Sequence, residues 1–102
     1  MDNSTVRGRE IIGIKGFHKV VYRIVGRKIF MYGKPTPQYY NLLSNFKQKD
    51  ALKRADTVGD WCCLELVESI NIDDLYGKFV DTMKLTLEKA GYKVTVSDLL
   101  NK

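Results

Sequence analysis

The segment QYYNLLSNFK at residues 38–47 has a counterpart 37 positions later, LYGKFVDTMK at residues 75–84. In both segments, apolar residues recur at intervals of three and four, which is the spacing of one face of an α-helix. Thr36 and Pro37 precede the first segment, and Asn71 precedes the second. Thr and Asn are favoured N-cap residues, and Pro fits the first helical position. We therefore expect two capped, amphipathic helices.

The two helical segments also align residue by residue. Tyr39 corresponds to Tyr76, Leu42 to Phe79, Leu43 to Val80, Phe46 to Met83 and Lys47 to Lys84. One explanation is an internal duplication of a helix-plus-strand unit, with halves at about residues 18–55 and 58–97 that share one sheet. The other is that the 3.6-residue period aligns any two amphipathic helices with matched caps.

The segment before the first helix predicts a β-hairpin over residues 18–32. Before the turn, Val20, Tyr22 and Ile24 alternate with Val21, Arg23 and Val25 along the chain. The Gly26-Arg27 dipeptide is a Gly-X pair, which suits a two-residue type II′ turn. Folding at this turn places Val25 opposite Lys28. Five apolar side chains then share one face of the hairpin, namely Val20, Tyr22, Ile24, Ile29 and Met31.

Three further segments predict strands, at residues 10–16, 60–69 and 92–96. The segment at 60–69, DWCCLELVES, is apolar on both faces, so we expect a central strand covered on both sides. ALKRAD at 51–56 is expected to continue the first helix at an altered angle, and SDLLNK at the end to form a tail. The predicted fold is α+β, with the element order β-β-β-α-β-α-β.

Length and composition indicate one globular domain over residues 1–102, with residues 1–9 as a flexible basic tail. No stretch approaches the roughly 20 apolar residues that span a bilayer. The polar beginning, MDNSTVRGRE, lacks the apolar core of a secretory signal. We therefore expect an intracellular protein that has no membrane partner.

The formal net charge of +5 is unevenly distributed. Residues 1–55 hold 12 Lys or Arg and 3 Asp or Glu, whereas residues 56–102 hold 5 and 9, so the halves carry +9 and −4. A basic half is compatible with nucleic acid, an anionic partner or self-association into a homo-oligomer. It is equally compatible with a solvated surface whose two halves offset each other.

Residues suited to catalysis or metal binding are sparse. Cys62 and Cys63 are adjacent and His18 is the sole histidine, a set that does not match the three or four spaced ligands of a metal site. Free cysteines are usually buried core residues. We expect no metal, no cofactor and no enzymatic activity.

Two binding hypotheses remain. The first is a protein-interaction module that holds a partner peptide in a groove between the two similar motifs, because tyrosines and large apolar residues are enriched at interfaces. Its candidate residues are Tyr39, Tyr40, Leu43, Tyr76 and Phe79. The alternative is a nucleic-acid-binding protein, because cations contact phosphates and rings stack on unpaired bases. Its candidate residues are Lys15, Lys19, Arg23, Arg27 and Lys28, beside the aromatic residues Phe17, Phe30 and Tyr32 of the hairpin.

The length of the chain, together with YYNLLSNFK and YGKFVDTMK, resembles small proteins of crenarchaeal filamentous viruses, of the Acidianus filamentous virus 1 kind. The resemblance implies a two-motif α+β fold, a viral protein expressed in the host cytoplasm, and a role in contacts with other proteins.

Overall fold

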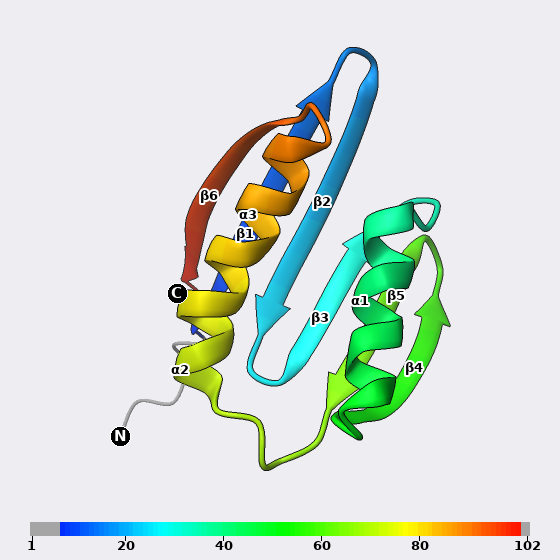
Figure 1. Cartoon of the computed structure of the whole chain (residues 1–102), viewed down its shortest axis with the longest axis vertical. Coiled ribbons are helices and arrows are strands. Elements are labelled where there is room, and N and C mark those ends of the chain that lie inside the picture. Colours follow the sequence, from blue (N-terminus) through cyan, green and yellow to red (C-terminus); the bar gives the residue numbers. More distant parts are fainter. Residues whose placement is uncertain (1–6, 101–102) are drawn as a thin grey trace.

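The computed structural model describes residues 7–100 and places six strands in one antiparallel sheet, with the helices on one side of it (Figure 1). The α+β class is confirmed. The elements are β1 (Arg7–Lys15), β2 (His18–Val25), β3 (Lys28–Tyr32), α1 (Pro37–Gln48), β4 (Leu52–Val58), β5 (Trp61–Leu66), α2 (Ile72–Asp74), the π-helical turn η1 (Leu75–Phe79), α3 (Val80–Lys89) and β6 (Lys93–Leu100). The three segments α2, η1 and α3 form one continuous helix, called the second helix below.

Across the sheet the strands follow the order β4-β5-β3-β2-β1-β6, and every pair of neighbours is antiparallel. From β3 onward the chain follows a β-α-β-β-α-β order, in which each helix connects two strands that are not neighbours. α1 crosses over β5, whereas the second helix crosses over β3, β2 and β1. The β1–β2 hairpin thus lies between β3 and β6.

The two helix-plus-strand units share one sheet and one side of it, but they cross different numbers of strands. The boundary expected between residues 55 and 58 falls inside β4. Internal duplication stays a prediction, because two helices on one sheet follow from their apolar faces whether or not the units share an origin.

The predicted hairpin is confirmed in position and register. Val25 lies opposite Lys28, and all five side chains expected on one face are buried. Gly26 has φ 60°, whereas Arg27 keeps a negative φ. This combination suits the predicted type II′ turn. The turn fixed the register of the hairpin, and the five apolar side chains on one of its sides decided which side faces the helices.

The expectation that ALKRAD continues the first helix is wrong, because residues 52–58 form strand β4. Asp50 has φ 54°, a left-handed conformation that Asp tolerates better than most residues and that ends a helix. The amide of Ala51 then donates to the carbonyl of Phe46, 2.9 Å away. β4 is an edge strand with mostly exposed side chains, so it lacks the apolar alternation that reveals buried strands.

Two further boundaries differ from expectation. β1 begins at Arg7, so residues 7–9 belong to the sheet rather than to a tail, and residues 1–6 lie outside the described part of the chain. β6 continues to Leu100 through the segment expected as the C-terminal tail. Both extensions arise from pairing between β1 and β6, in which Gly8 lies opposite Leu99. Such long-range pairing leaves no local sequence signal.

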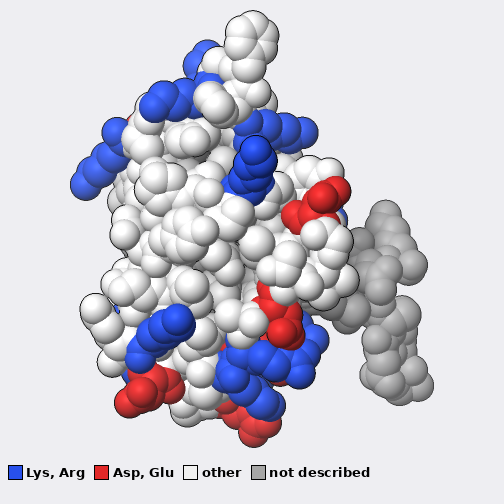
Figure 2. Space-filling view, turned by 90° about the vertical axis from the view of Figure 1, so that its right-hand side faces the viewer, with Lys and Arg blue, Asp and Glu red and all other residues white. Residues whose placement is uncertain are grey.

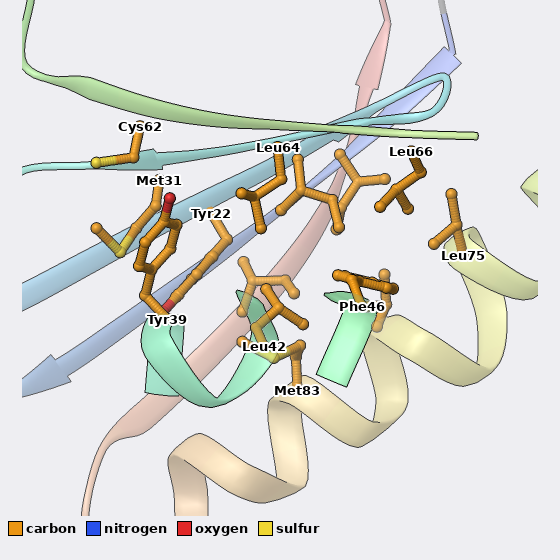
Figure 3. Close-up of a cluster of buried hydrophobic side chains, with 14 of the residues drawn as sticks. Tyr22, Met31, Tyr39, Leu42, Phe46, Cys62, Leu64, Leu66, Leu75 and Met83 are labelled. Atoms are coloured by element: carbon orange, nitrogen blue, oxygen red, sulfur yellow. The ribbon is translucent and has the colours of Figure 1, made fainter. Parts of the chain in front are cut away.

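The hydrophobic core lies between the sheet and the helices (Figure 3). α1 contributes three buried side chains and the second helix contributes five. They pack on alternate residues of the strands, including Tyr22, Met31, Leu64 and Leu66, which are at most 1% exposed. This one core joins residues from both expected halves, and the chain is held together by it. Among the described residues, no helix is long and apolar enough to span a bilayer.

β5 is an interior strand, but the expectation that both of its faces are covered is wrong. Cys62, Leu64 and Leu66 are buried under the helices, whereas Trp61, Cys63 and Glu65 are only half-buried. They belong to the side of the sheet that faces away from the helices, called the open face below. In the strand registers it carries Ile12, Val21, Arg23, Phe30, Tyr32, Trp61 and Cys63 among others.

Candidate functional site

A groove of about 860 Å³ lies between α1 and the second helix. Its apolar lining comes from both helices: Leu42 and Phe46 from α1, and Phe79 and Met83 from the second helix. Figure 3 shows Leu42, Phe46 and Met83 gathered where the two helices face each other. The rings of Phe46 and Phe79 are 5.9 Å apart between centroids and tilted by 36°. The groove expected between the two motifs is therefore present.

The lining of the groove also includes hydrogen-bonding groups from both helices. Asn41 and Asn45 are exposed on α1, and each amide offers donors and an acceptor. On the second helix, the hydroxyl of Thr82 donates to the carbonyl of Lys78 and that of Thr86 to the carbonyl of Thr82, both at 2.8 Å. Because each hydroxyl hydrogen is already used, the oxygen is left to accept from a ligand.

Charges in the groove balance. The lining contains Lys49 and Lys78 together with Asp50 and Asp74. Electrostatic attraction to a charged ligand is therefore weak, and apolar burial and hydrogen bonds dominate what this groove can bind. Binding there is expected to change little with moderate salt.

A π-helical turn forms part of one wall of the groove. Within η1, the carbonyl of Tyr76 accepts a hydrogen bond of 2.5 Å from Nη1 of Arg9 on β1. Nε of Arg9 lies 3.1 Å from the carboxylate of Asp98, although its N–H does not point at that oxygen, so this contact is an ion pair only. Arg9 thus ties the irregular turn that carries Phe79 to the sheet.

Of the five residues predicted for peptide binding, only Phe79 lines the groove. Tyr39 and Tyr76 are core residues, 6% and 8% exposed, and Leu43 is packed against the core. Tyr40 is exposed beside Tyr39, with ring centroids 5.7 Å apart, but lies outside the groove. The apolar stripes that carry Tyr39, Leu43 and Tyr76 pack on the sheet, so these side chains lie outside the groove, and the role of the four residues in binding stays a prediction.

The wall of the groove on α1 is instead the polar strip beside that stripe. It contains Gln38, Asn41, Asn45 and Lys49, spaced by three or four residues. This spacing is visible in the sequence, but it is also typical of a solvated helix face. Only the position of the second helix shows that this strip is the wall of a groove and not a fully solvated helix face.

The five basic residues predicted for nucleic-acid binding do not all lie on one face of the sheet. Lys15 donates to the carbonyl of Ala90 at 2.8 Å, and Nε of Arg27 donates to the carbonyl of Ile70 at 3.0 Å. Lys19, Arg23 and Lys28 lie on the open face. Lysine and arginine side chains also gather at the upper end of the molecule, where the tip of the β1–β2 hairpin lies (Figures 1 and 2).

The two cysteines point to opposite sides of the sheet. Cys62 is buried under the helices, and Cys63 is half-buried on the open face. Burial raises the pKa of the Cys63 thiol, which keeps it protonated near neutral pH. Among the described residues, no group of three or more His, Cys, Asp or Glu side chains is arranged to hold a metal ion.

Comparison with known proteins identifies no relative. No protein-family model matches the chain, and neither the curated proteins nor the solved structures contain a match to it. The function of the protein must therefore be argued from its own geometry.

Proposed function

We propose that the protein is a non-enzymatic interaction module that binds a peptide segment of a partner protein in the groove between α1 and the second helix. The supporting observation is the composition of that groove, which has apolar side chains between two strips of hydrogen-bonding groups. This combination is typical of peptide sites, where apolar contacts supply affinity and polar groups fix orientation. In line with the resemblance to viral proteins, the proposal includes a viral origin and a partner in the host cytoplasm.

The polar strips favour an extended peptide over a helical one. A helix satisfies its own backbone groups, whereas an extended chain presents N–H and C=O groups to both sides. Asn41 and Asn45 can donate to its carbonyls, and the hydroxyl oxygens of Thr82 and Thr86 can accept from its N–H groups. α1 has 12 residues, which corresponds to about 18 Å and so to about five or six extended residues.

The side chains of such a peptide are expected to alternate. Residues pointing into the groove would be apolar and would pack against Phe46, Phe79 and Met83. Residues pointing outward are unrestricted, because an extended chain places successive side chains on opposite sides. A selected peptide should therefore show apolar residues at every second position.

The proposal is tested by selecting binders from a library of random heptapeptides and measuring their affinity by fluorescence anisotropy. The double variant Asn41→Ala, Asn45→Ala should weaken binding about five- to 100-fold, because two hydrogen bonds of about 0.5–1.5 kcal/mol each are lost. Alanine is the best helix former, so the loss cannot be attributed to a weakened α1.

Tyr40→Ala provides the matched control, since Tyr40 is exposed on α1 outside the groove. Its affinity for the selected peptides should equal that of the unmodified protein. Selected peptides that tolerate the asparagine substitutions but not the loss of Tyr40 would move the site away from the groove and refute the proposal.

A further inference from the structure

The open face of the sheet contains a second hollow, of about 490 Å³, on the side opposite the helix groove. Its walls are the rings of Phe30 on β3 and Trp61 on β5 with the side chains of Val25 and Val58, and Cys63 also lines it. Three cations, Arg23, Lys28 and Arg54, complete the lining beside a single acid, Asp56. A hollow of this volume is in the range of small-ligand sites.

The aromatic rings of the open face are arranged edge to face. Phe30 and Trp61 have centroids 6.4 Å apart and planes at 89°, and Tyr32 lies 5.1 Å from Trp61 at 67°. The guanidinium carbon of Arg23 lies 5.2 Å from the centre of the Trp61 ring. In an edge-to-face pair the edge of one ring lies on one face of the other, so a flat base would stack on a ring face that stays uncovered. Tyr32 is 48% exposed and Val58 is 69% exposed, so both offer apolar surface beside these rings.

The charge of the open face is positive around these rings. Glu10 is paired with Arg23 at 2.7 Å, and Asp56 is paired with Arg54 at 2.6 Å. Glu65 lies 3.9 Å from Nζ of Lys53. Three lysines of this face, Lys19, Lys28 and Lys93, have no ion pair within the described part of the chain. The strand registers place Lys19 and Lys93 on either side of Ile14.

We propose that the open face binds single-stranded nucleic acid, with a base in the hollow that Phe30 and Trp61 line and the phosphates near Lys19, Lys28 and Lys93. Single strands are bound by rings that stack on unpaired bases and by cations that track the backbone, and the aromatic residues of such surfaces lie on adjacent strands of an open sheet. β3 and β5 are adjacent here. This site is independent of the helix groove, because the sheet separates the two.

The main rival for this face is a second copy of the chain. Two open faces brought together would place the unpaired lysines of both copies in one interface, which costs free energy by like-charge repulsion. The phosphates of a nucleic acid neutralise the same lysines. The Cys63 thiol in the hollow adds no negative charge, since burial raises its pKa. The charge of the face therefore favours the nucleic acid.

The test uses fluorescein-labelled dT10 and U10 in anisotropy titrations of the full chain, together with the emission of unlabelled protein. Trp61 is the sole tryptophan, so stacking of a base in the hollow should quench the whole tryptophan signal. If the three unpaired lysines each contact a phosphate of a single strand, log K should fall with log salt with a slope of about −2. The affinity should thus drop about 20-fold between 50 and 200 mM salt.

Matched variants locate the site. Lys28→Glu should weaken binding at least tenfold, whereas Lys84→Glu, the same charge reversal on exposed α3, should weaken it far less. Phe30→Ala should weaken binding roughly 5- to 100-fold through the loss of one stacked base, while Tyr40→Ala should have no effect. Lys28 is exposed, so its variant remains informative even if Phe30→Ala lowers stability.

Quenching of Trp61 by either oligonucleotide, with the expected difference between Lys28→Glu and Lys84→Glu, supports the proposal. If Lys28→Glu and Lys84→Glu lose the same amount of affinity, the binding is non-specific charge attraction and the proposal is overturned. Sedimentation showing a dimer that Phe30→Ala dissociates, without binding of dT10 or U10, would assign the face to a second copy and overturn it as well. None of these outcomes depends on the groove between the helices.

Discussion

The hydroxyl of Tyr76 connects the second helix to the turn of the β2–β3 hairpin, and its removal gives a direct test of the structure. It accepts a hydrogen bond of 3.0 Å from the backbone amide of Gly26, fifty residues earlier in the chain. Tyr76→Phe keeps the buried ring and removes the hydroxyl that accepts this bond. The amide of Gly26 is then left without its protein partner at a partly buried position.

The expected cost is about 1 kcal/mol, the usual net contribution of a hydrogen bond, because Gly26 is only half-buried and water can replace part of the lost contact. For a chain of 102 residues this corresponds to a fall in Tm of about 4–8 °C. In urea, where the free energy of unfolding falls by about 1–3 kcal/mol per molar, the midpoint should decrease by about 0.3–1 M.

Urea unfolding followed by the fluorescence of Trp61 measures this change. Tyr40→Phe is the matched control, since Tyr40 is on the exposed surface of α1 and 56% exposed. It should leave the midpoint unchanged. Equal midpoints for Tyr76→Phe and the unmodified protein would show that the hydroxyl does not tie helix to hairpin, and would restore Tyr76 as a candidate for ligand contact.

Three further outcomes are expected. Gly8→Ala should destabilise the protein by about 1–3 kcal/mol, because the new Cβ would lie 2.8 Å from the backbone oxygen of Ile24. Gly77→Ala should instead stabilise the protein by about 0.5–1 kcal/mol in the same urea assay, because its new Cβ would meet no atom within 4 Å. Burial raises the pKa of Tyr22 above 10, so the free energy of unfolding should be fully retained below pH 10 and should fall as the pH rises further; a Tyr22→Phe variant that declines just as steeply would contradict this. Cys63, whose pKa is also raised by burial, should react with a disulfide reagent at pH 8 more slowly in the folded protein than in urea, and equal rates would contradict its protected position.

The sequence predicted those parts of the fold that depend on neighbouring residues. Thr36 accepts from the amide of Tyr39 at 3.2 Å as an N-cap, and Asn71 accepts from the amides of Asp73 and Asp74. Each feature involves groups within four residues of one another, so a single window of sequence contains all of the chemistry.

The candidate sites were predicted less well, because each is formed by elements that are distant in the chain. The groove needs Asn45 of α1 beside Thr82 of α3, and the hollow of the open face needs Phe30 of β3 beside Trp61 of β5. Tyr39 and Tyr76 are predicted for binding because tyrosines, which are large and amphipathic, are enriched at interfaces. The same properties place them in the core, where the ring is buried and the hydroxyl finds a partner.

The sequence alone determined the α+β class, the two capped helices, the hairpin register and the uneven distribution of charge. Caps, turns and amphipathic periods act through short-range hydrogen bonds and through the choice of a buried face, and both are encoded locally. Only the tertiary structure decided that β4 is a strand, that the β1–β2 hairpin lies between β3 and β6, and that the helices of residues 7–100 all lie on the same side of the sheet. These outcomes depend on pairing between strands that are distant in the chain. Such pairing uses backbone hydrogen bonds, which do not depend on the side chains, so a single sequence does not reveal it.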